Sequence, residues 1–267
     1  MAAHEDIEYG DGFKEAEYAL LGYGLVDAEN CSFNWSRGGP NRSTNKAQLD
    51  NLEQLFRATL CRDSRNAIFV TVPGPKLREC LTSCPNLNPA GGAYDPQVID
   101  HHLAASLEKT TPLDLRGVPV GMLRLEVQAG QHRLTALRQL LDKDQVSADS
   151  AFTGSSVPRA SEDLWWPAFI FDSEKLKYSD LEKLRINGAN NSFEDTDGIV
   201  WLRVLNIEEQ EGSIPASLRR HIFAQTNRER AGNNHAKKPA THSGLLDVWS
   251  GRYKEVVRIE STTLGRW

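Results

Sequence analysis

Residues Gly130-Gln131-His132-Arg133 bring several phosphate-binding groups together within one turn of the chain. Residues 122–128 alternate as in a half-buried strand, and leucines then recur at the three- and four-residue spacing of a helix. A strand that ends in glycine and opens into a helix presents unpaired backbone N–H groups and the positive end of a helix dipole. Gln131 adds a neutral donor, His132 a titratable donor and Arg133 a charged fork suited to phosphate oxygens. The segment therefore predicts an anion site; the competing interpretation is a tight turn, a hydrogen-bonded histidine and a solvated arginine.

Other residue types that carry chemistry are less well arranged. Cys80 and Cys84 are three residues apart, but no second pair or nearby histidine completes a four-ligand zinc set. The paired histidines, His101 with His102 and His235 with His242, lack supporting cysteines or carboxylates, so we expect no metal site. The sequence has no nucleophile elbow, Walker lysine loop or dinucleotide-binding glycine motif, which removes the commonest hydrolase, P-loop and Rossmann interpretations.

The overall charge limits how the chain can bind nucleic acid. Its 267 residues carry a formal net charge of −5, with a pI near 5.8, which argues against a basic surface that grips DNA or RNA as a whole. Residues 218–238 are the exception, because this segment contains six arginines and lysines and one acidic residue, Glu229. That cluster predicts local guidance of a polyanion, and the competing interpretation is a solvated helix face.

The sequence also predicts a compartment. No apolar run approaches the roughly 18 residues of a membrane-spanning helix, and the first residues lack a basic and then apolar signal pattern. Four scattered cysteines are too few for a secreted disulfide framework, so free thiols are expected. We therefore expect an intracellular protein, cytoplasmic or nuclear, that has no membrane partner.

Periodicity and turn-forming residues divide the chain into elements. We expect an irregular segment over 1–45, a core over 46–210 and a helical extension over 211–267. Within the core, proline-rich 73–97 and serine-rich 148–163 are expected to be insertions with little regular structure. Helices are predicted over 46–60, 98–107, 176–184, 213–227 and 245–257, and strands over 67–72, 122–128, 165–171 and 199–207, with Pro167 favouring a sheet edge for 165–171.

The segment Val127-Gln128-Ala129-Gly130-Gln131-His132-Arg133-Leu134-Thr135-Ala136-Leu137 resembles the second box of the ParB/sulfiredoxin superfamily. Partition ParB proteins have Gly-Glu-Arg-Arg there, sulfiredoxins Gly-Cys-His-Arg, and DGQHR-domain proteins Gly-Gln-His-Arg, which is the nearest version. The segment Ala224-Gln225-Thr226-Asn227-Arg228-Glu229 is similar to the third ParB box. The resemblance implies an α/β (α+β) ParB/sulfiredoxin-like domain, a small mixed sheet with flanking helices, that binds ATP or CTP with Mg²⁺. It implies that Gln225, Asn227 and Arg228 close over a nucleotide held by Gly130, Gln131, His132 and Arg133.

The chain departs from these families at residues that matter for their reactions. Ala129 stands where the DGQHR group has aspartate, and Ala224 stands where ParB has a glutamate associated with nucleotide-bound magnesium. Gln131 replaces the sulfiredoxin cysteine, and a neutral amide cannot act as a thiolate nucleophile. These differences argue against ParB-type hydrolysis and against sulfiredoxin chemistry.

Three functions remain open from the sequence. The first is a module that binds a nucleotide or the backbone of DNA or RNA and switches with occupancy. The second is an enzyme, a phosphotransferase, NTPase or nuclease, in which His132 is the candidate catalytic residue and Glu126 or Glu229 would supply a base. The third is a scaffold for protein interactions that keeps the fold without the ligand. The residues alone do not decide whether the protein is an enzyme.

Overall fold

The computed structural model describes residues 11–37, 44–84, 87–88, 92–109, 111–151, 164–185 and 206–215. The chain divides into two compact units. The first comprises Met1–Ser36 with Pro40–Leu176, and the second comprises Arg37–Gly39 with Lys177–Trp267. The anion-site candidate at Gly130 lies in the first unit.

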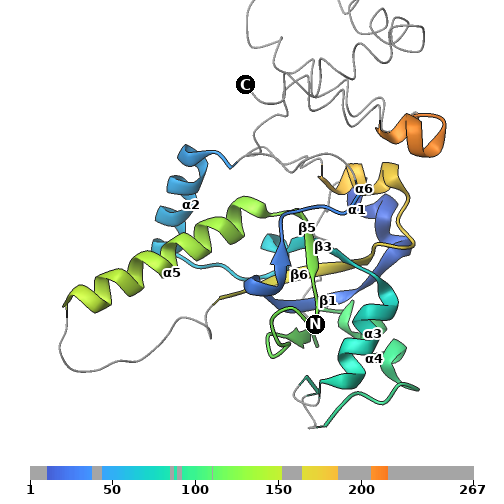
Figure 1. Ribbon diagram of the computed structural model, residues 1–267, viewed down its shortest axis with the longest axis horizontal. Coiled ribbons are helices and arrows are strands. Elements are labelled where there is room, and N and C mark those ends of the chain that lie inside the picture. The colour runs from blue at the N-terminus through green and yellow to red at the C-terminus, as the bar shows by residue number, and fades with distance from the viewer. Residues whose placement is uncertain are drawn as a thin grey trace, which may run out of the picture. The chain divides into compact units, whose positions relative to one another are not determined.

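The first unit is built on a mixed six-stranded sheet with flanking helices, as expected for an α/β (α+β) protein (Figure 1). The strand order is β2-β5-β3-β6-β1-β4. The pairs β2/β5, β3/β6 and β1/β4 are parallel, whereas β5/β3 and β6/β1 are antiparallel. The strands are β1 (Leu20–Asp27), β2 (Cys31–Ser32), β3 (Ile68–Val72), β4 (Leu113–Leu115), β5 (Leu125–Ala129) and β6 (Trp165–Asp172).

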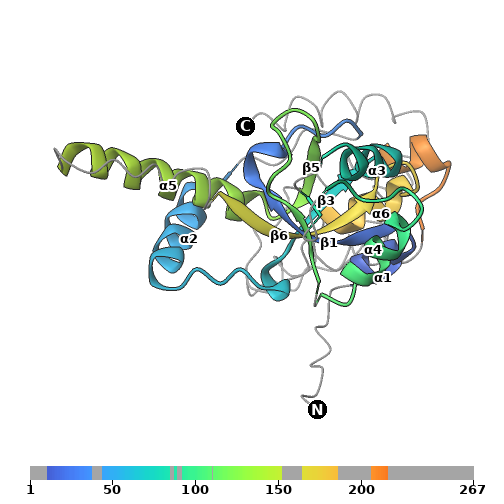
Figure 2. The ribbon, with the colours of Figure 1, turned by 90° about the horizontal axis from the view of Figure 1, so that it is seen from below.

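Helices surround this sheet and connect its strands. Helices α2 and α5 pack against each other, and α5 continues past α2 and away from the sheet (Figures 1 and 2). The α-helices of the first unit are α1 (Asp11–Ala16), α2 (Lys46–Ala58), α3 (Gly74–Ser83), α4 (Ile99–Ser106) and α5 (Gln131–Ala151). Short 3₁₀ turns occur at η1 (Glu17–Ala19), η2 (Ala28–Asn30) and η3 (Ser64–Asn66).

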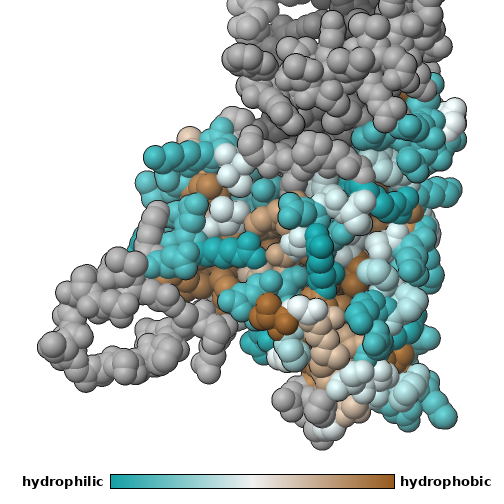
Figure 3. Space-filling model, viewed as in Figure 1, coloured by the Kyte–Doolittle hydropathy of each residue, from teal (hydrophilic) through white to brown (hydrophobic). Residues whose placement is uncertain are grey.

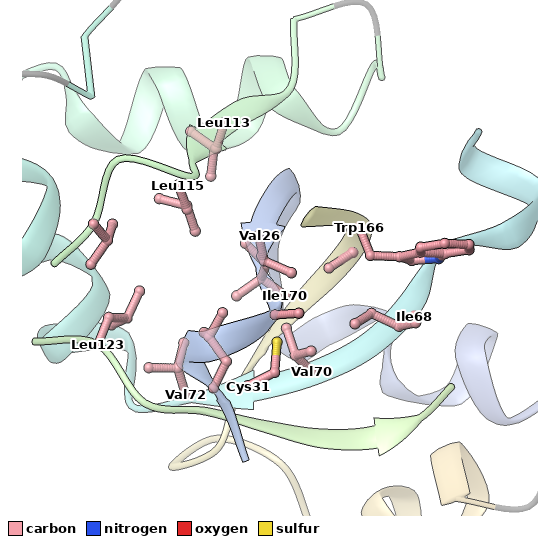
Figure 4. Packing of buried hydrophobic residues seen from close by; sticks show 14 of the residues in the cluster. Val26, Cys31, Ile68, Val70, Val72, Leu113, Leu115, Leu123, Trp166 and Ile170 are labelled. Atoms are coloured by element: carbon pink, nitrogen blue, oxygen red, sulfur yellow. The ribbon is translucent and has the colours of Figure 1, made fainter. Parts of the chain in front are cut away.

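One face of the sheet carries the main hydrophobic core. Because side chains alternate across a strand, Val70 of β3 and Ile170 of β6 point to the same face and meet Val26 of β1 (Figure 4). Leu134 and Leu137 of α5 belong to the same fully buried cluster. This packing fixes the start of α5 against the sheet.

The opposite face carries a cluster of aromatic rings. Phe69 of β3 and Phe169 and Phe171 of β6 alternate with the core residues and contact Phe13 of α1. The ring centroids of Phe13 and Phe169 are 4.9 Å apart in an edge-to-face arrangement, which is a favourable geometry for aromatic pairs. Helix α1 thus covers a part of the sheet that a purely irregular N-terminus would leave open.

The expectation of an irregular segment over 1–45 was therefore wrong, since β1 and α1 lie within it. Two glycines obscured the strand, because glycine weakens a strand pattern in the sequence. A Cβ atom at Gly22 would lie 2.5 Å from Ser106 Oγ, and one at Gly24 would lie 2.8 Å from the backbone oxygen of Leu113. The glycines allow α4 and β4 to approach β1 closely, a requirement that appears only in the folded protein.

The interpretation of 73–97 as an insertion with little regular structure was also wrong, because α3 occupies its first part. Pro75 lies in the first turn of this helix, where the missing N–H removes no helical hydrogen bond. Leu77 and Leu81 are buried in the main core. Apolar spacing, rather than proline content, decided the structure of this segment.

Strand β6 does not lie at an edge of the sheet, as Pro167 had suggested; it lies between β3 and β1. Pro167 pairs with Leu25 of β1, while the ladder with β3 begins one residue later at Ala168. The side of Pro167 that faces β3 therefore has no strand partner, and the sheet accepts a proline in a central strand.

Three other boundaries differ from the expectation. Helix α5 runs to Ala151, into the segment 148–163 that was expected to be a loop, and the rest of that segment lies outside the described residues. Residues 206–211 are helical, although a strand was predicted over 199–207, whose first part is not described. Residues 213–215 are not helical, and the remainder of the predicted 213–227 helix, like that over 245–257, lies outside the described residues.

In the second unit, α6 (Tyr178–Arg185) contacts the helix over 206–211. Ser179 donates its backbone N–H to Glu211 Oε1 over 2.7 Å, which caps the beginning of α6. The buried guanidinium of Arg185 pairs with Glu182 and donates to the backbone oxygen of Arg37 over 2.7 Å. This buried cation is thus paired within its own unit.

The described surface is mainly hydrophilic on the face shown in Figure 3, where hydrophobic side chains form small separate patches. Among the described residues, no helix combines the length and the apolar character that crossing a membrane requires.

Candidate functional site

The site is organised around the turn at Gly130, where β5 ends and α5 begins. Gly130 has φ +99°, a left-handed conformation that side chains disfavour. A Cβ atom there would lie only 2.2 Å from Cγ2 of Ile68 in β3. Backbone conformation and packing therefore both demand glycine, and they bring the backbone of the turn close to the sheet. The predicted order of strand, glycine turn and helix is present.

The first turn of α5 has backbone donors available. The backbone oxygen of Gly130 accepts the N–H of Leu134 over 3.2 Å, which closes the first helical hydrogen bond. Within the described part of the chain, no side chain accepts from the backbone N–H of Gln131 or Arg133. These groups lie at the positive end of the helix dipole, where anions are stabilised.

Arg133 is a half-buried cation without an anionic partner among the described residues. Its Nη1 donates to the backbone oxygen of Asn66 over 3.4 Å, beyond the usual range of about 2.7–3.2 Å for such bonds. Burial lowers the pKa of Arg133, because removing water disfavours the charged form. The side chain remains charged at neutral pH and carries a desolvation cost that a bound anion would offset.

His132 links the beginnings of two helices. Its Nε2 accepts the backbone N–H of Asn45 over 3.1 Å, and Asn45 is the N-cap of α2. The Asn45 side chain in turn accepts the N–H of Gln48 over 3.3 Å. An accepting Nε2 must carry a lone pair, so the imidazole is neutral and its proton is on Nδ1. The positive ends of α2 and α5 are thereby held close together.

Polar residues of β5 support the strand before the turn. Both oxygens of Glu126 accept the backbone N–H of Ser36 at 3.1 Å. The buried amide of Gln128 donates to Thr71 Oγ1 of β3 over 2.7 Å. Glu126, the candidate base, therefore holds the segment after β2 in place.

The sequence did not point to Asn45 and Asn66, which the structure places beside the predicted residues. The backbone oxygen of Asn66 accepts a hydrogen bond from Nε1 of the buried Trp166 over 2.8 Å. It also accepts the longer hydrogen bond from Arg133. Asn45 contacts His132, and Asn66 contacts Arg133, through backbone groups, which every residue type has. The residue types therefore did not reveal these contacts. The N-cap preference for asparagine before an amphipathic helix is the one clue that applied, and it applied to Asn45.

The residues assigned to the third box cannot be compared with this geometry. Gln225, Asn227, Arg228 and the alternative base Glu229 lie outside the described residues, as does the basic cluster over 218–238. Of the predicted site, the structure describes Gly130, Gln131, His132 and Arg133, which follow one another on a single turn.

Comparisons of the chain with models of protein families, with curated proteins and with solved structures gave no match. The fold alone defines the class: an α/β protein with a mixed sheet. Its candidate anion site is the turn between β5 and α5. The likeness to the ParB/sulfiredoxin superfamily depends on the motifs quoted above.

Proposed function

We propose that this protein binds the phosphate groups of a nucleotide or a nucleic acid at the turn Gly130-Gln131-His132-Arg133, as a ParB-like module that switches with occupancy. The observation that carries the proposal is the position of Arg133. Its half-buried guanidinium has one long hydrogen bond and no carboxylate partner in the described part of the chain. A buried charge that the protein does not pair is costly, and a phosphate would pair it.

Three further features favour an anion at this point. The N–H groups of Gln131 and Arg133 begin α5, and the N-cap of α2 lies beside them through Asn45 and His132. Two helix dipoles therefore contribute positive potential at one place. Gly130 lets the turn lie directly against Ile68 of β3, which fixes the backbone N–H groups that follow it. ATP or CTP with Mg²⁺ is the ligand that the ParB resemblance favours.

Binding is better supported than catalysis by the described residues. His132 uses Nε2 to accept the Asn45 N–H, so that nitrogen cannot take a substrate proton without losing the bond. Glu126 already accepts the N–H of Ser36 with both oxygens. A phosphotransferase, NTPase or nuclease would need these contacts to rearrange, whereas a binding module would not.

The proposal is tested by isothermal titration of ATP, CTP and GTP, with and without Mg²⁺, into the full chain and into Arg133→Gln. Arg124→Gln is the matched control, because Arg124 is an exposed arginine that contacts Ser32 and Asn34, away from the turn. A charge-assisted hydrogen bond contributes about 1.5–3 kcal/mol, so Arg133→Gln is expected to weaken binding about 10- to 100-fold. Arg124→Gln is expected to bind as the unsubstituted chain does.

The same proteins are then titrated with a labelled single-stranded oligonucleotide at several salt concentrations. Binding that depends on Arg133 and weakens steeply with salt would assign the site to a nucleic-acid backbone instead of a free nucleotide. Absence of saturable binding by every nucleotide and by the oligonucleotide would contradict the proposal and favour the scaffold. Phosphate or nucleoside diphosphate release in parallel samples would show turnover.

A further inference from the structure

Three sulfur-bearing residues come together in the described part of the core, at a distance in sequence from the Gly130 turn. Cys80 lies in the last turn of α3 and Cys84 is the C-cap of the same helix, so the two share one helix face. Met122 lies in the turn before β5. Its Sδ is 3.2 Å from the Sγ of Cys84, so the two sulfurs are in direct contact.

We propose that Cys80, Cys84 and Met122 form a site for a soft monovalent metal ion, Cu(I) in the cell and Ag(I) as its analogue. Thiolates and thioethers are the ligands that select Cu(I) over harder cations. In the described residues, no group of three or more His, Cys, Asp and Glu side chains is arranged to hold a metal. The set therefore lacks the nitrogen or fourth sulfur ligand that a structural zinc site requires.

The contact between the Cys84 and Met122 sulfurs needs little change to accept an ion. Metal–sulfur bonds of about 2.3 Å place three ligands in a trigonal plane about 4 Å from one another. The Cys84 and Met122 sulfurs would separate by under about 1 Å to reach this spacing, and methionine has three flexible torsions for such a movement. The backbone N–H of Cys84 donates to the backbone oxygen of Cys80 over 3.0 Å, which holds the two residues one helical turn apart.

The surroundings suit a low-coordinate soft ion. Cys80 and Cys84 are 1% and 6% exposed and lie within the apolar core cluster, which excludes water and competing hard ligands. Met122 is only partly buried and offers a route of entry from the surface.

Metal binding would exchange protons for the ion, because a cysteine binds a metal as its thiolate. One Cu(I) displaces a proton from each thiol, both protons pass to solvent, and the product is a bis-thiolate complex with a thioether as third ligand; no electron is transferred. The loaded site then carries one net negative charge, from two thiolates and one Cu(I).

The test uses the full chain in a Cys61→Ser background, because Cys61 is the exposed cysteine among the four. The protein is titrated without oxygen, first with Ag(I) and then with Cu(I) in competition with a chromophoric Cu(I) chelator. We expect one equivalent to bind, with ultraviolet thiolate-to-metal absorption and a rise in Tm. Zn(II) is expected to produce neither signal.

Matched variants locate the site. Met122→Leu keeps the core volume and removes only the thioether, and Cys84→Ala removes one thiolate. Even an outer partner of a metal contributes about 10- to 100-fold to affinity, so Met122→Leu should weaken binding at least about tenfold and Cys84→Ala should abolish it. Cys31→Ser alters another buried cysteine and should leave binding unchanged.

Two results would overturn the proposal. The first is Ag(I) and Cu(I) binding that persists unchanged in Met122→Leu, whose fold is checked by its thermal unfolding curve. The second is a Cys80–Cys84 disulfide in the purified full chain, seen as a mass loss of two hydrogens and a thiol titre that excludes these residues. The first would show adventitious binding, and the second would show a redox pair in place of a metal site.

Discussion

Helices α3 and α5 both begin where a strand of the sheet ends, and a glycine lies at both turns. At α3, the backbone N–H of Gly74 donates to Oδ1 of Asp172 over 3.0 Å, so a buried carboxylate of β6 occupies the positive end of the helix. At α5, the described residues place no carboxylate at the corresponding point, and Arg133 adds a positive charge. One helix start is neutralised by the protein itself, and the other is the start at which we propose that an external anion binds.

The two helix starts have the same local structure, but we assign a stabilising role to the start of α3 and a binding role to the start of α5. Asp172 also accepts the N–H of Glu174 over 3.1 Å, and it approaches Nζ of Lys175 at 3.9 Å. Its charge is therefore satisfied locally, and its role is to fix α3 on the sheet. Arg133 has no carboxylate partner among the described residues, so its burial costs stability that the proposed anion would return. Substitutions at the two helix starts should thus have opposite effects on folding and on binding.

The largest effect is expected from Gly130→Ala. A left-handed residue other than glycine costs about 1–2 kcal/mol, and overpacking against Ile68 adds about 1–3 kcal/mol. We therefore expect the free energy of unfolding to fall by about 2–5 kcal/mol in urea denaturation followed by circular dichroism. Gly121→Ala is the control, since Gly121 has φ +86° but a Cβ atom added there would meet no atom within 4 Å. Equal losses in both variants would show that the contact with Ile68 is not a constraint.

Asp172→Ala should destabilise the start of α3, where the Asp172 carboxylate accepts the N–H of Gly74. It leaves the buried N–H of Gly74 without an acceptor, which costs about 1–3 kcal/mol, and it removes a carboxylate that is 2% exposed. Asp172→Asn keeps an acceptor oxygen and should lose less. Both are measured by urea denaturation, and both should leave nucleotide affinity unchanged. A loss of nucleotide affinity without a loss of stability would reverse the roles assigned to the two helix starts.

Local patterns explain why the strand, turn and helix around Gly130 were predictable from the sequence and other parts of the fold were not. The strand, glycine turn and helix around Gly130 are encoded within one short segment, so alternation and leucine spacing were sufficient. Strand β1 was missed because its two glycines, Gly22 and Gly24, are required by close packing against Ser106 and Leu113, which are distant in sequence. The same limit applies to Met122, whose contact with Cys84 arises only when α3 packs beside the turn before β5.

The partners of the site residues were hidden for a related reason. Asn66 and Asn45 take part through backbone groups, so their residue types reveal little about the contacts to Arg133 and His132. Pro167 misled because the rule against proline in a central strand holds only where both neighbours are paired, and here the β3 ladder begins at Ala168. Sequence reasoning was reliable where one segment decides its own structure, and it failed where a distant segment decides it.

Arg133→Met sharpens the comparison, because it separates folding from ligand binding at the α5 start. Methionine fills a similar volume without a charge, so the free energy of unfolding should stay the same or rise by about 1 kcal/mol. Binding of phosphate-bearing ligands should nevertheless weaken at least as much as in Arg133→Gln, by about 10- to 100-fold, in isothermal titration. Thermal unfolding with and without nucleotide gives a second readout, since only a protein that binds the ligand gains stability from it. A clear loss of stability without ligand would mean that the Asn66 contact, not an anion, explains the position of Arg133.

The smallest loss of stability is expected from His132→Ala, which removes the link between the starts of α2 and α5. The backbone N–H of Asn45 would lose its acceptor, at a cost of about 0.5–1.5 kcal/mol in urea denaturation. His101→Ala is the control, because His101 is exposed on α4 and surface substitutions usually change stability by under about 0.5 kcal/mol. Nitrogen NMR of the imidazole should show the proton on Nδ1. A proton on Nε2 would contradict the bond to Asn45 and would return His132 to the set of candidate acid–base groups, because Nδ1 would then carry the lone pair that accepts a proton from a bound ligand.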